Sequence, residues 1–220
     1  MKRAALIAGA TGLVGSHCLR LLLADGAYER VTAFVRRGLA VSHPKLVQRE
    51  IDFDLLADLG NVPRVHDVFC CLGTTMKKAG TQEAFRRVDL DFVVELARVA
   101  GRHRAAQFLL VSSLGAHPGS RVFYSRVKGQ AEEAVKRVGF DAVHIFQPSL
   151  LLGHRAERRV GERLATVAAR ALVPLLAGPL RRYRPIGAET VARAMIAVAR
   201  RAERGVHTYP SDQIEALARP

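Results

Sequence analysis

Three side chains in the middle of the chain have the types and the spacing that proton transfer requires. Tyr124 precedes Lys128 by four residues, which places both on one face of a helix, and Ser113 lies eleven residues before the tyrosine. A nearby ammonium favours the ionised phenol, so the tyrosine can give and take a proton, and a serine hydroxyl can orient a carbonyl oxygen. The alternative is a tyrosine and a lysine on the exposed face of an amphipathic helix.

Three glycines near the start of the chain have the spacing of a phosphate-binding turn. Gly9, Gly12 and Gly15 follow an apolar run and open a helical segment. The first permits a tight turn, the second lets backbone N–H groups approach a pyrophosphate, and the third lets the helix pack closely on the strand. A purely structural turn is the alternative. The predicted cofactor contacts of this glycine loop are Gly9, Thr11, Gly12, Leu13, Val14 and Gly15.

Two arginines indicate which dinucleotide the loop would bind. Arg36 and Arg37 end the second predicted strand, about 21 residues after Gly15, where a protein that prefers NAD carries an acidic residue for the ribose hydroxyls. Guanidinium groups fit a 2′-phosphate instead. The pair therefore predicts NADP(H) as the preferred cofactor and NAD(H) as the second option, unless these are simply solvated arginines.

The elements that must position these residues alternate between strand and helix. Apolar runs predict strands at 4–8, 31–35, 46–51, 68–72, 108–111 and 142–146, and helical periodicity covers 13–24, 83–100 and 122–138. This alternation predicts an α/β doubly wound parallel sheet, a Rossmann fold, in one domain over residues 1–220. A small C-terminal α/β extension from about residue 150 would lie on the substrate side. We expect helices there at 162–176 and 188–202, a loop at 178–186 and a strand at 206–209.

Composition restricts the class of protein. The 220 residues are 49% apolar and carry a net charge of +14, and their arginines are dispersed, with no basic run interleaved with aromatics. This favours solvated arginines over a nucleic-acid-binding surface. No apolar run is long enough to span a membrane, and the first residues lack a signal-peptide cleavage site. The three cysteines have neither disulfide nor zinc spacing, so we expect a metal-free cytoplasmic protein.

Several segments together resemble a known family. The glycine loop, Ser113, Tyr124 and Lys128 are similar to the extended and atypical short-chain dehydrogenases/reductases, a group that includes NAD-dependent epimerases and dehydratases. The resemblance covers nearly the whole chain and is closest to the Tat-interacting oxidoreductase-like branch. The segments that carry it are 70–75, 78–80, 87–89, 112–116 and 124–129.

The resemblance implies roles for further residues. It makes Ser113, and not Ser112, the catalytic serine, and it places Lys128 at the nicotinamide ribose. Other positions would surround the cofactor: Asp52 and Phe53 near the adenine, Leu72 and Gly73 along it, and Pro148 and Ser149 near the nicotinamide.

Two positions depart from the family pattern. Asp89 stands where many short-chain enzymes carry an asparagine of the proton relay, which puts that relay in question. Gln147 precedes Pro148 where relatives often have arginine, which suggests that a substrate-binding charge is missing.

The predicted function is that of an NADP(H)-binding oxidoreductase that acts on an unknown carbonyl or alcohol through Ser113, Tyr124 and Lys128. Two alternatives are a regulatory protein that senses the dinucleotide without turnover and a nucleotide-sugar epimerase or dehydratase. The short C-terminal region disfavours the epimerase. Candidate pocket loops are 74–81 and 154–163. The expected partners are a small-molecule substrate and, by resemblance, a second copy of the chain paired through the helices at 83–100 and 122–138.

Overall fold

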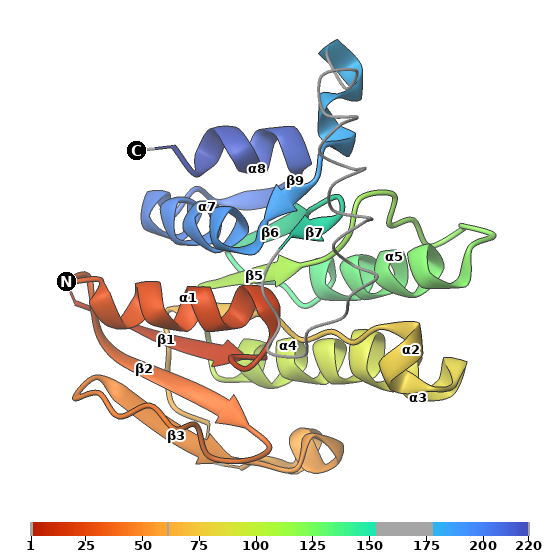
Figure 1. Cartoon of the computed structure of the whole chain (residues 1–220). Coiled ribbons are helices and arrows are strands. Elements are labelled where there is room, and N and C mark those ends of the chain that lie inside the picture. Colours follow the sequence, from red (N-terminus) through yellow and green to blue (C-terminus); the bar gives the residue numbers. More distant parts are fainter. Residues whose placement is uncertain (1, 61, 153–177, 220) are drawn as a thin grey trace.

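A seven-stranded sheet forms the centre of the computed structural model, which describes residues 2–60, 62–152 and 178–219 (Figure 1). Its strands follow the order β3-β2-β1-β4-β5-β6-β9, and every neighbouring pair is parallel. The predicted doubly wound Rossmann fold is therefore confirmed. The strands are β1 (Arg3–Ala8), β2 (Tyr28–Val35), β3 (Leu46–Glu50), β4 (Asp67–Cys70), β5 (Gln107–Val111), β6 (Ala142–Gln147) and β9 (Gly205–Pro210).

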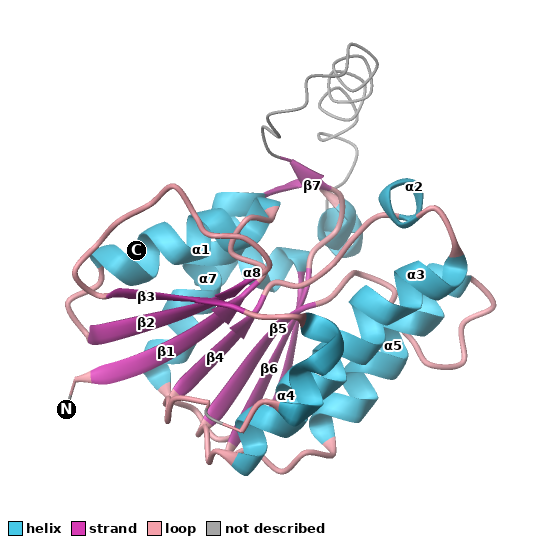
Figure 2. Ribbon diagram, turned by 90° about the horizontal axis from the view of Figure 1, so that it is seen from below, coloured by secondary structure: helices cyan, strands magenta, loops and turns pink. Residues whose placement is uncertain are grey.

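Helices cover both faces of the sheet (Figure 2). One face carries α1 (Leu13–Ala24), α7 (Ala188–Arg201) and α8 (Ser211–Leu217). The other carries α3 (Gln82–Arg86), α4 (Phe92–Arg102) and α5 (Phe123–Lys136).

Successive residues of each inner strand supply the two hydrophobic cores in turn. In β1, Ile7 packs toward α1 and α7, whereas Leu6 packs toward α4 and α5. Phe69 and Val68 divide in the same way in β4. Since both faces are covered, the inner strands are continuous apolar runs in the sequence, which is why they were predictable.

The structure corrects several predicted elements. The helix expected at 83–100 is three segments, because a π-helical turn (Arg87–Asp91) separates α3 from α4. Strand β4 ends at Cys70, two residues early, and the loop at 74–81 contains the short helix α2 (Met76–Ala79). The loop at 178–186 contains a 3-10 helix (Gly178–Tyr183) and the start of β8 (Ile186–Gly187), which pairs with β7 (Leu151–Leu152). The helix predicted at 162–176 and the loop at 154–163 lie outside the described residues.

Two further properties hold for the described part of the chain. None of its helices combines the length and the apolar character that crossing a membrane requires. Its cysteines are all free thiols, and among residues 2–60, 62–152 and 178–219 no His, Cys, Asp and Glu side chains gather in a group that could hold a metal ion.

Candidate functional site

The glycine loop follows β1 and packs against the backbone just after β4. Gly9 directly follows β1 with φ +85°, and a Cβ at this position would collide with the carbonyl oxygen of Cys71, just after β4. A Cβ at Gly15, in the first turn of α1, would collide with the carbonyl oxygen of Gly9. Gly12 donates its N–H to that same carbonyl at 2.9 Å. The tight turn and the close packing of helix on strand both depend on the absence of side chains here.

The N-terminus of α1 is open to an anion. Gly12 caps the helix without a side-chain hydrogen bond, and the first turn contains no acidic residue. The N–H groups and the partial positive charge of this helix end therefore point to the edge of the sheet where the parallel strands finish. The residues present fit a dinucleotide pyrophosphate, since the cradle has room only for glycine and lacks any competing negative charge.

The residues predicted around the adenosine half divide into exposed and buried side chains. Arg36 and Arg37 are exposed just beyond β2, and neither forms a hydrogen bond or an ion pair with another described residue. Asp52 is exposed and accepts a hydrogen bond from the N–H of Asp54 at 2.9 Å, which caps a 3-10 helix. Phe53 is buried in the core against Phe92, at 5.6 Å between ring centroids, so its side chain serves packing.

Helix α5 brings Tyr124 and Lys128 together, as their spacing predicts. Tyr124 lies half-buried in the first turn and packs on Phe85, with 5.4 Å between ring centroids. Lys128, one turn later, is only 6% exposed, and its Nζ lies 2.8 Å from Oδ1 of Asp89. Burial lowers the pKa of the Lys128 ammonium, but Asp89 and Tyr124 more than offset this, so its pKa is raised and the lysine is charged.

Asp89 is the link between α5 and the loop after β4. It belongs to the π-helical turn, is 1% exposed, and accepts the N–H of Thr74 on Oδ2 at 2.8 Å. A Cβ at Gly73 would lie 3.3 Å from Oδ1 of Asp89 and 3.6 Å from Nζ of Lys128. The Leu72–Gly73 step, predicted to line the cofactor, therefore lies directly against the ion pair.

The two serines after β5 have different surroundings. Ser112 is buried and donates a short hydrogen bond to Glu132 of α5, whereas Ser113 is half-buried with a long contact of 3.4 Å to the carbonyl oxygen of Leu114. Ser113 is thus the serine with a hydroxyl free to turn toward a ligand. The segments after β5 and β6 are joined by a hydrogen bond, since Leu114 donates its N–H to the carbonyl of Pro148 at 2.9 Å.

Glu132 was missed by sequence reasoning, although it lies four residues after Lys128 on the same face of α5. Nε2 of Gln147 donates to both of its carboxylate oxygens, at 3.0 and 3.1 Å. Burial raises the pKa of Glu132, and the hydrogen bonds from Ser112 and Gln147 offset this only in part. Gln147 therefore joins β6 to α5, and its amide is engaged in the scaffold.

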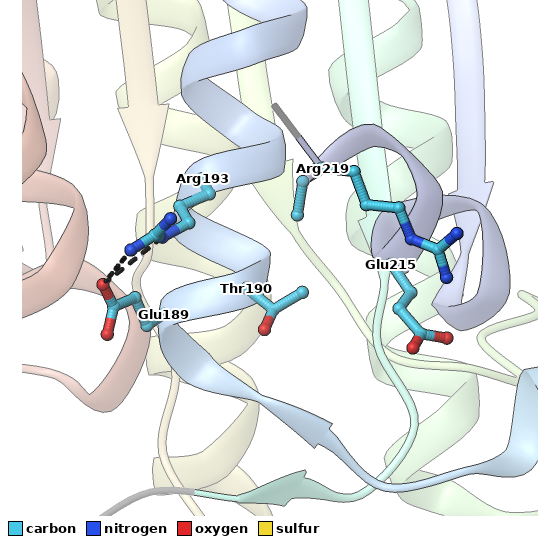
Figure 3. A pocket seen from close by; sticks show the side chains of 6 residues that line it. Glu189, Thr190, Arg193, Glu215 and Arg219 are labelled. Atoms are coloured by element: carbon cyan, nitrogen blue, oxygen red, sulfur yellow. Dashed lines mark hydrogen bonds and ion pairs between the residues drawn. The ribbon is translucent and has the colours of Figure 1, made fainter.

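A separate hollow lies on the opposite face of the sheet (Figure 3). It has a volume of about 420 Å³ and runs between α7 and α8. Charged side chains dominate its wall, and Arg193 donates to Glu189 at 3.0 Å, one turn earlier on α7. This hollow contains none of the predicted catalytic residues.

Comparison with known proteins agrees with this geometry. A family model described as NAD(P)H-binding matches residues 9–174. Protein HTATIP2 of Rattus norvegicus is 38% identical over 167 residues, which are 74% of this chain and 69% of that protein. Protein fmp52, mitochondrial, of Emericella nidulans is 35% identical over 179 residues, which are 78% of this chain and 76% of that protein.

Solved structures with a similar fold hold both kinds of dinucleotide. The Bordetella bronchiseptica enzyme WbmH in complex with NAD+ has a TM-score of 0.71 at 16% identity, over 96% of this chain and 76% of that chain. The human epimerase family protein SDR39U1 with NADPH has a TM-score of 0.63 at 19% identity, over 93% of this chain and 73% of that chain. At such identities the likeness shows the fold alone.

The expectation of a cytoplasmic protein is contradicted. The FMP52 relatives from Emericella nidulans, Coccidioides immitis and Candida glabrata are all named mitochondrial. Free cysteines indicate a reducing environment and do not by themselves identify a compartment.

The relatives share sequence with this chain over most of their length, and the matched family model spans the glycine loop, Asp89, Ser113, Tyr124 and Lys128. The fold, the glycine cradle and the comparisons lead to one conclusion. The chain belongs to the NAD(P)H-binding family of Rossmann-fold proteins, together with HTATIP2 and the FMP52 proteins.

Proposed function

We propose that this protein is an NADP(H)-dependent oxidoreductase of the short-chain type that acts on a carbonyl or an alcohol. The observation that carries the proposal is that Tyr124 and Lys128 lie on one face of α5. This helix contacts the carboxyl end of β5, where Ser113 lies, through the hydrogen bond between Ser112 and Glu132. Because all strands are parallel, this end of β5 shares an edge of the sheet with the glycine loop after β1. A proton donor and a dinucleotide cradle thus lie along one edge.

The roles of the side chains follow from their chemistry. When bound, the reduced nicotinamide supplies a hydride. Tyr124 gives a proton to the carbonyl oxygen as that oxygen becomes an alcohol, and takes it back in the reverse direction. Ser113 donates a hydrogen bond to the same oxygen. The positive charge of Lys128 stabilises the phenolate that Tyr124 becomes after it has given up its proton.

The proposed preference for NADP(H) rests on the exposed guanidinium groups beyond β2. Arg36 and Arg37 are free to form charge-assisted hydrogen bonds with a 2′-phosphate. The loop from Arg36 to β3 contains no acidic residue, and the carboxylate of Asp52, which follows β3, already caps a 3-10 helix through Asp54.

A fluorescence titration with NADPH and NADH tests the cofactor proposal. We expect tighter binding of NADPH by about 1–3 kcal/mol, and loss of this preference in the double variant Arg36→Ala/Arg37→Ala. The matched control is Arg30→Ala, an exposed arginine near the other end of the same strand, which should keep the preference. Equal affinities for both nucleotides in the wild type would refute an NADP(H) preference, and failure of folded protein to bind either would refute the oxidoreductase.

Binding of the dinucleotide without turnover is the second candidate. It is favoured by the ion pair that holds Lys128 to Asp89 and by the lack of a hydrogen bond between Tyr124 and Ser113, both of which lie in the described part of the chain. NADPH consumption with a panel of aldehydes, ketones and quinones separates the two. Consumption that disappears in Tyr124→Phe identifies an enzyme, and binding without consumption identifies a sensor.

A further inference from the structure

The ion pair between Asp89 and Lys128 lies at the junction of three segments of the site. Lys128 belongs to α5, Asp89 to the π-helical turn, and Asp89 also holds the N–H of Thr74 in the loop after β4. That loop begins at Cys71, whose carbonyl oxygen closes the space beside Gly9. A chain of contacts therefore runs from the glycine loop to the lysine, and Asp89 is the charged member in its middle.

The π-helical turn explains how an aspartate comes to occupy this position. The N–H of Phe92 donates to the carbonyl of Arg87, five residues back, which adds one residue to the turn. Both Asp89 and Leu90 are buried there, while Arg87 remains exposed and pairs with Asp54. Such turns are frequent at functional sites. The extra residue puts a carboxylate inside the site without removing Leu90 from the core.

A carboxylate at this position changes the charge next to the reacting ring. An asparagine would leave the buried Lys128 as an unopposed positive charge, whereas Asp89 makes the pair neutral. The oxidised nicotinamide carries a positive charge and the reduced one does not. At short range in a partly buried site, an unopposed ammonium repels the oxidised form selectively.

We propose that Asp89 is a positioning residue that sets the preference of the site between the oxidised and the reduced dinucleotide. By neutralising the charge of Lys128, Asp89 raises the affinity of the site for NADP+ relative to NADPH. Its second carboxylate oxygen meanwhile holds the loop at Thr74. The inference rests on the proposed function, because it requires the nicotinamide to lie beside Lys128.

The test is the ratio of the dissociation constants of NADP+ and NADPH, measured by calorimetry on the whole protein. In Asp89→Asn the ratio should rise about tenfold, since NADP+ weakens relative to NADPH. The asparagine retains an oxygen for the N–H of Thr74, so a purely structural role would leave the ratio unchanged. Glu95→Gln, which removes a carboxylate from the surface of α4, is the matched control and should not alter the ratio.

Two further variants keep the test decisive if Asp89→Asn is unstable. Lys128→Met should shift the ratio in the opposite direction, and Asp89→Leu/Lys128→Met, which is neutral again, should return it toward the wild-type value. Thermal shifts at saturating NADP+ and NADPH give the same ratio for a marginally stable variant. An unchanged ratio in a folded Asp89→Asn variant that binds both nucleotides overturns the inference. Wild-type protein that binds neither nucleotide defeats the proposed function instead.

Discussion

Buried acids occur at both edges of the sheet, and the fold uses them differently. At the amino ends of the strands, Asp67 accepts from Arg3 at 2.5 Å, from Tyr28 at 2.6 Å and from Gln107 at 2.8 Å. At the carboxyl ends, Asp89 contacts the ammonium of Lys128 and one N–H among the described residues, and its Oδ1 has no hydrogen bond of good geometry there. The carboxylate of Asp67 is satisfied by three side-chain donors, although Oε1 of Gln107 beside it has no partner among the described residues, whereas the carboxylate of Asp89 keeps one oxygen without a hydrogen bond.

The two tyrosines show the same contrast. Tyr28 is fully buried and donates to Asp67, and burial together with that carboxylate raises the pKa of its phenol. Tyr124 is half-buried, packs on Phe85, and makes no hydrogen bond with a described residue. A phenol whose hydroxyl is bonded within the core cannot transfer protons to a substrate, so accessibility makes Tyr124, and not Tyr28, the candidate proton donor.

Removing the hydroxyl group of each tyrosine should test the difference between their roles most clearly. Tyr124→Phe should lower the rate of NADPH-dependent reduction by about 10²–10⁴-fold and leave the free energy of unfolding nearly unchanged. Tyr28→Phe should do the reverse, with a loss of about 1–3 kcal/mol in stability and normal turnover per folded molecule, because Asp67 loses one of its donors. Single-turnover kinetics and urea denaturation measure the two effects. Equal losses of rate in both variants would contradict the division of roles.

The network around Asp67 should contribute more to stability than an exposed acid does. Asp67→Ala removes the buried carboxylate that opposes the charge of Arg3 and accepts from Tyr28 and Gln107, so we expect a loss of about 3–5 kcal/mol in the free energy of unfolding. Asp58→Ala, at an exposed position, is the control and should change stability by less than about 0.5 kcal/mol. An equally small loss at Asp67 would show that the amino-end network is not a structural centre.

Glu132 offers a finer test, because it is buried at the ligand edge without a cation in direct contact. Its pKa is raised in the folded protein, so folding favours its protonated form, and its contribution to stability is full below about pH 4.5 and lost as the pH rises through the folded pKa. Compared with wild type, Glu132→Gln should therefore gain stability progressively as the pH rises from 4.5 to neutral. Urea denaturation across this range measures the difference, and parallel curves for the two proteins would show that Glu132 does not titrate in this way.

The sequence predicts the scaffold well because local signals agree with the fold. Helix α1 has the predicted bounds, since the glycine loop fixes its start and an apolar face fixes its extent. The site is only partly predictable, because its decisive contacts join distant residues. Nothing in the spacing of Gln147 reveals that its amide binds Glu132, and helical periodicity over 83–100 hides the extra residue that turns Asp89 inward. The prediction that the strand at 68–72 extends to residue 72 was wrong, because the chain leaves β4 after Cys70 and passes beside Gly9.

The collision of any side chain at Gly9 with the Cys71 carbonyl has a kinetic meaning. A turn locked between two strands is already assembled before the nucleotide arrives, so association does not have to freeze a mobile loop. Little ordering entropy is then lost on binding, and the encounter rate is set mainly by diffusion and by charge. The same close packing leaves no room for even one added methyl group at Gly9, so the positions of β1 and of the segment after β4 fix the conformation of the turn.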